Sequence, residues 1–255
     1  MTDTQRFVTL TSPVTRHIGE MLVFPIIKAL YFANGTEVHK LIGTGFFIDS
    51  RRFVTARHVF KGRGSASDLE GATGFAVYCV HTVDLTRRAV ARHIDMSSIV
   101  TRGDTDIATG LVELNQFGRP NPAIVESELV DTGFISRFRT EPVAVGTAVY
   151  TIAYPLTRLT YTAPHHVNIH AKSDSFSGRV TKHFPTGRDS GLLSWACYET
   201  DMEVKGGASG GPVMIAGSSG VVFAVNCTGT EPHAVSHITS LAPLFGPRVA
   251  NAPAT

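Results

Sequence analysis

Hydrophobic residues along this chain fall in short runs, and turn-forming residues separate one run from the next. Stretches with the 3.6-residue period of an amphipathic helix are scarce. Eight runs have the β-branched and aromatic content of strands: 45–48, 74–80, 107–114, 148–153, 167–171, 194–198, 213–216 and 221–226. Many short strands with glycine, proline, asparagine and serine between them predict an all-β sandwich or barrel.

One long stretch interrupts this pattern. Residues 116–145 contain several prolines and few strand-like runs, and we expect a short helical turn around 124–130. We interpret the stretch as a connector within a single unit of residues 1–255. It separates an N-terminal part over 20–115 from a C-terminal part over 146–242.

The composition is that of a globular protein. The chain has 255 residues, of which 43% are hydrophobic and 17% are charged, and this suffices for a substantial core. A formal net charge of +2 gives no electrostatic reason to expect a nucleic-acid or membrane-surface partner. The three cysteines, Cys79, Cys197 and Cys227, are too few for a disulfide framework. We expect buried free thiols and a reducing compartment.

The first residues lack the basic segment followed by an apolar segment that marks a secretory signal. The apolar run over 21–27 is too short to span a bilayer. We therefore expect a soluble, cytoplasmic protein that does not associate with membranes.

The clearest chemical signal is the run 206–212, with the sequence GGASGGP. Glycines permit a sharp turn that presents Ser209 outward, with backbone N–H groups beside it. Such donors stabilise the oxyanion that forms when a serine hydroxyl attacks a carbonyl carbon. A glycine-rich hairpin loop without chemistry is the alternative interpretation.

Two other segments supply the partners that a nucleophilic serine needs. His58 ends the β-prone run 53–58, and histidine is the side chain best suited to accept the serine proton. A carboxylate on the other ring nitrogen fixes the tautomer of such a histidine. Asp106 begins a strand-like run and is the favoured carboxylate, while Asp104 is the competing candidate and better suits a solvated turn.

Together these segments resemble the signature blocks of chymotrypsin-like serine proteases. The matching segments are 55–58 (TARH), 106–108 (DIA) and 207–212 (GASGGP). Residues 43–48 (GTGFFI) and 200–201 (TD) are similar to the bacterial HtrA-like branch, and 146–155 (GTAVYTIAYP) resembles the first strand of the second barrel of that family. The resemblance spans roughly residues 40–240. It implies two packed six-stranded antiparallel β-barrels, one over 20–115 and one over 146–242, with the catalytic cleft between them.

The resemblance also implies roles for individual residues. It implies a serine endopeptidase that forms an acyl-enzyme, with Ser209 as the nucleophile. His58 is then the general base, and Asp106 orients His58. The oxyanion hole consists of the Gly207 and Ser209 amides. Cofactors are not required, and the partner is a protein or peptide substrate.

The same resemblance places two substrate-binding elements. Glu203 falls at the floor of the side-chain pocket, where a carboxylate favours lysine or arginine in the substrate. Lys205 stands close enough in sequence to neutralise it, so a small or apolar preference is an equal alternative. The backbone that pairs with the substrate as an added strand is the segment Asn226, Cys227, Thr228 and Gly229.

The chain departs from the digestive members of the family at Ala208, where those enzymes carry an aspartate that pairs with a new N-terminus after zymogen cleavage. We therefore expect activity without N-terminal processing. The peptide-binding PDZ domain common in HtrA-like proteins is also not expected. The three histidines His165, His166 and His170 have no cysteine or carboxylate at ligand spacing, so we expect no metal site there.

Two other functions remain as alternatives to a general endopeptidase. One is a catalytically idle protease-like scaffold that binds peptides, and the other is a self-processing protease with one dedicated substrate. The presence of His58, Asp106 and Ser209 together argues against the idle scaffold, because a site that performs no chemistry does not need all three.

Overall fold

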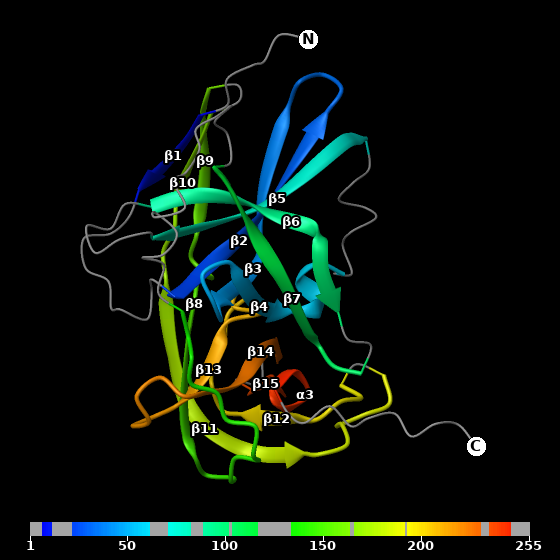
Figure 1. Ribbon diagram of the computed structural model, residues 1–255, viewed down its shortest axis with the longest axis vertical. Helices are drawn as coiled ribbons and strands as arrows, with labels where there is room; N and C mark the ends of the chain where they lie inside the picture. The colour runs from blue at the N-terminus through cyan, green and yellow to red at the C-terminus, as the bar shows by residue number, and fades with distance from the viewer. Residues whose placement is uncertain are drawn as a thin grey trace.

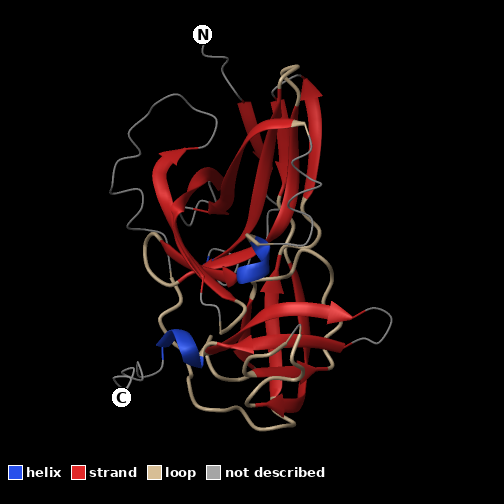
Figure 2. Cartoon of the chain, turned by 90° about the vertical axis from the view of Figure 1, so that its right-hand side faces the viewer, coloured by secondary structure: helices blue, strands red, loops and turns tan. Residues whose placement is uncertain are grey.

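The structure of the protein is a computed structural model. It describes residues 7–11, 22–61, 71–82, 89–101, 104–116, 134–163, 166–191, 193–230 and 235–245. These residues form strands almost throughout, and two barrels stack along the long axis of the molecule (Figures 1 and 2). The helical turn expected around 124–130 lies outside the described residues.

The first barrel closes in the order β2-β3-β4-β7-β6-β5. Neighbouring strands are antiparallel throughout. The strands are β2 (Val23–Phe32), β3 (Glu37–Phe47), β4 (Arg52–Ala56), β5 (Ala72–Thr82), β6 (Ala89–Thr101) and β7 (Ile107–Gln116). Aromatic side chains fill its interior, and the Phe24 ring lies 4.6 Å from that of Phe47 and 5.8 Å from that of Phe53 between ring centroids.

The second barrel closes in the order β11-β12-β15-β14-β13-β8, again with antiparallel neighbours. The strands are β8 (Ala148–Ala153), β11 (Asp174–Phe184), β12 (Cys197–Thr200), β13 (Pro212–Ile215), β14 (Val222–Thr230) and β15 (Val235–Ser240). Strand β8 shows why such a sequence closes a barrel. Its alternate residues Val149, Thr151 and Ala153 are buried, as the two-residue period of a strand with one inward face requires.

A three-stranded sheet extends from the second barrel alongside the first (Figure 1). Strand β9 (Arg158–Ala163) forms a hairpin with β10 (His166–His170), and β1 (Phe7–Thr11) pairs with β10 in parallel. The Tyr161 hydroxyl on β9 lies 2.5 Å from the His39 amide on β3, which ties the hairpin to the first barrel. The chain ends its described part in the short helix α3 (Ala242–Phe245).

The architecture confirms the predicted all-β fold of two six-stranded barrels. The predicted free and buried state of Cys79, Cys197 and Cys227 is also confirmed. Some strand limits differ from the sequence pattern, as in β3, which begins at Glu37, well before the run 45–48. Among the described residues, no helix is long and apolar enough to cross a membrane.

Candidate active site

Ser209 lies on the loop between β12 and β13, where two tight turns follow each other. The Ala208 amide donates to the Lys205 carbonyl at 3.1 Å, and the Gly211 amide donates to the Ala208 carbonyl at 3.0 Å. Gly210 has φ +91°, and a Cβ there would lie 2.1 Å from the Thr44 carbonyl oxygen. Only glycine fits that position, because both the backbone angle and the available space exclude a side chain.

The first barrel holds this loop from the other side. The Thr44 amide on β3 donates to the Ser209 carbonyl at 2.8 Å. The Thr44 hydroxyl is fully buried, donates to the Gly207 carbonyl at 2.9 Å and accepts the Tyr154 amide at 3.1 Å. One threonine therefore connects β3, the end of β8 and the serine loop through its own hydrogen bonds.

His58 and Asp106 lie at adjoining ends of paired strands in the first barrel. His58 belongs to the short 3-10 helix η1 (Arg57–Val59) that directly follows β4, and Asp106 directly precedes β7. The His58 amide donates to Oδ1 of Asp106 at 3.0 Å, and Nδ1 of His58 lies 2.7 Å from Oδ2. The Asp106 side chain is 3% exposed and that of His58 is 41% exposed. This arrangement fixes the ring through Nδ1, and within the described part of the chain no residue bonds to its other nitrogen.

The carboxylate of Asp106 has a second side-chain partner that the sequence did not indicate. The buried Cys227 on β14 donates its thiol to Oδ2 of Asp106 at 2.9 Å. Burial, and then the neighbouring Asp106 carboxylate, raise the pKa of the Cys227 thiol well above its usual value. The thiol is therefore neutral and acts as a hydrogen-bond donor.

Ser209 joins this group through Cys227, since the Ser209 hydroxyl donates to the Cys227 carbonyl at 3.3 Å. In the described part of the chain, Ser209 makes no direct hydrogen bond to His58. The two residues still lie in one tightly packed region. A Cβ at Gly43 would meet Val59, the neighbour of His58, at 2.6 Å and the Ser209 carbonyl at 3.0 Å. Nucleophile-to-base hydrogen bonds are often long or misaligned in unliganded enzymes and tighten with substrate.

The amides expected to form the oxyanion hole are those of Gly207 and Ser209. Among the described residues, neither the Gly207 N–H nor the Ser209 N–H donates to another group of the chain. Gly207 has φ +89°, and a Cβ there would lie 2.8 Å from the Leu41 side chain. Both donors are therefore available to a bound oxyanion, and glycine allows the first barrel to approach closely.

The remaining predicted residues occupy different settings. Asp104 is exposed, in contrast to the buried Asp106. Glu203 is exposed as well, and Lys205 pairs with Asp174 at 3.7 Å rather than with Glu203. Whether Lys205 offsets the charge of Glu203 therefore stays a prediction.

The segment expected to bind the substrate backbone has an open edge. Strand β14 pairs with β13 only as far as Val225, whereas its pairing with β15 continues to Thr230. On the same edge, the Asn226 amide donates to the Gly211 carbonyl at 2.9 Å and the Gly210 amide donates to the Asn226 carbonyl at 2.8 Å. The edge without a paired strand in the described chain is therefore that of residues 227–230. Asn226 is buried and donates to the Thr151 hydroxyl at 2.8 Å, while Thr228 is exposed.

The histidine cluster at which we expected no metal site is only partly described. His165 and the side chain of His166 lie outside the described residues. Among the described residues, the one group of three or more His, Cys, Asp or Glu side chains with close ligand atoms is His58, Asp106 and Cys227, whose atoms all lie within 4.8 Å of one another.

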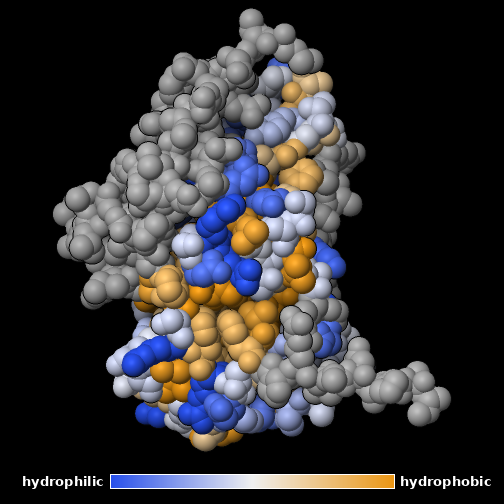
Figure 3. All heavy atoms as spheres, in the orientation of Figure 1, coloured by the Kyte–Doolittle hydropathy of each residue, from blue (hydrophilic) through white to orange (hydrophobic). Residues whose placement is uncertain are grey.

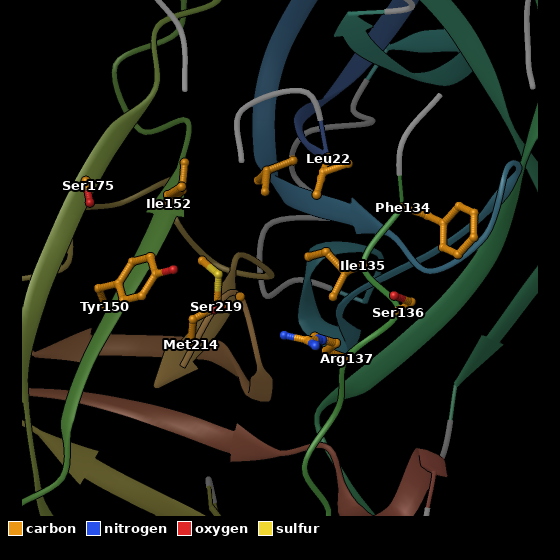
Figure 4. Close-up of a pocket in the computed structure, with 12 residues that line it drawn as sticks. Leu22, Phe134, Ile135, Ser136, Arg137, Tyr150, Ile152, Ser175, Met214 and Ser219 are labelled. Carbon is orange, nitrogen blue, oxygen red and sulfur yellow. The ribbon is translucent and has the colours of Figure 1, made fainter. Parts of the chain in front are cut away.

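A mostly apolar hollow of about 510 Å³ lies at the junction of the two barrels. Tyr150, Ile152 and Ser175 face it from one side, and Leu22 and Ile135 from the other (Figure 4). Hydrophobic side chains gather at the waist of the molecule on this face (Figure 3). None of His58, Asp106 or Ser209 lines the hollow, so it is separate from the candidate active site.

Comparisons with known proteins agree with this fold. The model of the trypsin-like peptidase domain matches residues 43–225, which include His58, Asp106 and Ser209. The active form of the protease Rv3671c from M. tuberculosis matches with a TM-score of 0.50 and 16% identity, over 100% of this chain and 95% of that one. An inactive form of Rv3671c from strain H37Rv, with a serine changed to alanine, matches with a TM-score of 0.49 and 18% identity, over 89% and 85%. A search of curated proteins found no match. Because the domain model covers most of its length, this chain belongs to the trypsin-like peptidase family.

Proposed function

We propose that the protein is a serine endopeptidase that hydrolyses peptide bonds through an acyl-enzyme. The observation that carries the proposal is that the Asp106 carboxylate accepts two hydrogen bonds, one from the His58 amide and one from the His58 ring, beside the glycine-framed Ser209. A buried carboxylate that accepts from Nδ1 keeps the ring proton there and leaves Nε2 as an acceptor. This is the tautomer that a general base for serine requires.

The reaction follows from these positions. Ser209 Oγ attacks the scissile carbonyl carbon while Nε2 of His58 takes its proton, and Asp106 stabilises the resulting imidazolium. The Gly207 and Ser209 amides stabilise the oxyanion. His58 then gives the proton to the leaving amine, and water repeats the sequence to hydrolyse the acyl-enzyme. The Ser209 hydroxyl must turn from the Cys227 carbonyl toward His58, a rotation about one side-chain bond.

An extended peptide is the substrate that the open edge of β14 supports. Its backbone can add to residues 227–229 as a further strand, and side-chain pockets then supply the preference. Glu203 is proposed to face the substrate side chain from its exposed position. Lys205 pairs with Asp174 instead, and an exposed carboxylate at position 203 favours lysine or arginine in the substrate.

Digestion of an unfolded protein substrate tests the proposal. The wild-type chain and Ser209→Ala are incubated with reduced, alkylated protein, and the products are sequenced by mass spectrometry. We expect cleavage at internal bonds by the wild type and a loss on the order of 10⁴-fold or more in kcat for the variant. Internal cleavage that continues unchanged in Ser209→Ala, or a wild type without any cleavage, would exclude the proposed mechanism.

A further inference from the structure

We propose that His58, Asp106 and Cys227 form an inhibitory binding site for a zinc-like divalent cation. The site offers one nitrogen, one oxygen and one sulfur ligand, all within 4.8 Å of one another. The inhibition rests on the proposed function, because it acts through His58, whereas the binding itself does not.

The three ligand atoms are of the types that zinc binds in proteins. Imidazole nitrogen, carboxylate oxygen and cysteine sulfur are its usual partners, and three protein ligands plus water are a common set. A hydroxyl in place of the Cys227 thiol would leave only two good ligands. The thiol therefore distinguishes this site from an ordinary histidine–aspartate pair and selects a borderline-soft metal over magnesium or calcium.

The distances allow the ion after a small adjustment. Oδ2 of Asp106 already lies 2.7 Å from Nδ1 of His58 and 2.9 Å from Sγ of Cys227. Ligand atoms around a tetrahedral zinc ion are separated by about 3.4 Å, given bond lengths of about 2.0–2.3 Å. The ligand atoms must therefore move apart by about 0.5–0.7 Å.

His58 is the group that can move, and it also provides access. Its side chain is 41% exposed, whereas that of Asp106 is 3% exposed and Cys227 is 5% exposed. An outward swing of the ring opens the space between its Nδ1 and the two buried ligands. Solvent on the exposed side of the ring then supplies the fourth ligand, and the ion enters from that side.

Binding exchanges protons for the metal in a balanced way. The Cys227 thiol loses its proton to solvent and binds as a thiolate. The proton on Nδ1 of His58 moves through solvent to Nε2, and the Nδ1 lone pair binds the ion. Asp106 binds as the carboxylate. Net charge at the site rises by one, from the two charges of the ion less the one proton released.

The tautomer of His58 is what couples binding to inhibition. With the ion on Nδ1, Nε2 carries a proton and cannot accept the one from Ser209. The general base is thereby removed without any contact between the ion and the substrate. The serine keeps its place on the loop but loses its reactivity.

Direct binding is measured first, by adding Co²⁺ as a spectroscopic substitute for Zn²⁺ to the Ser209→Ala protein. We expect an absorption band from thiolate-to-cobalt charge transfer with one ion per chain, displaced by Zn²⁺ and abolished by EDTA. The same band should be absent in Ser209→Ala with Cys227→Ser. Cys197→Ala is the matched control, because Cys197 is a buried thiol in the same apolar cluster and is not a proposed ligand. A band that survives Cys227→Ser, or no band in Ser209→Ala, overturns the site.

Inhibition is measured second, as labelling of Ser209 by a fluorophosphonate probe in chelator-treated protein with added Zn²⁺. Each variant is compared with its own rate without metal. We expect reversible loss of labelling, and an inhibitory concentration on the order of tenfold or more higher in Cys227→Ser. Equal inhibition of both proteins overturns the proposal. Failure of labelling without metal would instead refute the proposed function, and the cobalt spectrum would still decide the binding site.

Discussion

Replacing Thr44 with valine tests the buried connection between the two barrels and the serine loop. The Thr44 hydroxyl donates to the Gly207 carbonyl at 2.9 Å and accepts from the Tyr154 amide at 3.1 Å, and no part of the residue reaches solvent. Valine has nearly the same shape as threonine, so the variant leaves no cavity. It removes the hydrogen-bond partner of two backbone groups and changes little else.

The size of the effect follows from those two groups. A buried polar group without a partner costs about 1–3 kcal/mol. The hydrogen bond from the Tyr154 amide is buried, so its loss carries the full cost of an unpaired polar group. The hydrogen bond to the Gly207 carbonyl is only partly buried, so water offsets part of the cost of losing it. We therefore expect the free energy of unfolding to fall by about 2–4 kcal/mol. Labelling of Ser209 should also slow, because the Gly207 carbonyl adjoins the proposed oxyanion donors.

Urea unfolding followed by Trp195 fluorescence measures the loss of stability. Thr44→Ser is the control, since it keeps the hydroxyl and removes one methyl group, with an expected cost of about 1 kcal/mol. A Thr44→Val protein as stable as Thr44→Ser would show that the hydroxyl does not hold the loop, and the reasoning would be refuted.

Three further substitutions test the ionisable side chains of Asp106, Asp104 and His237. Asp106→Asn should lower kcat by on the order of 10⁴-fold, because the amide favours the wrong tautomer of the His58 ring. Asp104→Asn should leave kcat nearly unchanged. If a peptide-hydrolysis assay gives the reverse result, Asp104 is the residue that orients His58. His237 is buried, with Arg188 at 2.9 Å and Glu199 at 3.9 Å, and burial followed by the Arg188 charge lowers its pKa. The unfolded chain therefore binds the proton more readily, so stability is retained above about pH 6.5 and falls as the pH drops below it. His237→Gln should flatten this loss between pH 7.5 and 5.5 in urea unfolding, and an unchanged slope would contradict the assignment.

The parts of the site that the sequence predicted are those with a local signal. Ser209 stands between Gly207 and Gly210, whose positive φ angles and close contacts require glycine, and the resulting glycine-rich run is visible in the sequence. His58 and Asp106 each adjoin a strand, so the residue pattern marks their places. Their contact also needs β4 and β7 to be neighbours, and the structure supplies that strand order.

The parts that the sequence did not predict depend on contacts between distant segments. Cys227 and Asp106 are 121 positions apart in the chain, and no local sequence pattern at either residue predicts their hydrogen bond. The Thr44 hydroxyl likewise meets Gly207 across 163 positions. The parallel pairing of β1 with β10 is of the same kind, because strand register is set by tertiary packing rather than by local propensity.

The most direct test of the central claim is to find where a fluorophosphonate probe binds the intact chain. The chain is labelled without prior proteolysis, its intact mass is measured, and the adduct is located by peptide sequencing. Since Ala208 offers no carboxylate to an N-terminal activation switch, we predict one adduct per chain, on Ser209, and none in His58→Ala. An unlabelled wild type, or labelling that persists in His58→Ala, would contradict the account of Ser209 as a nucleophile activated by His58.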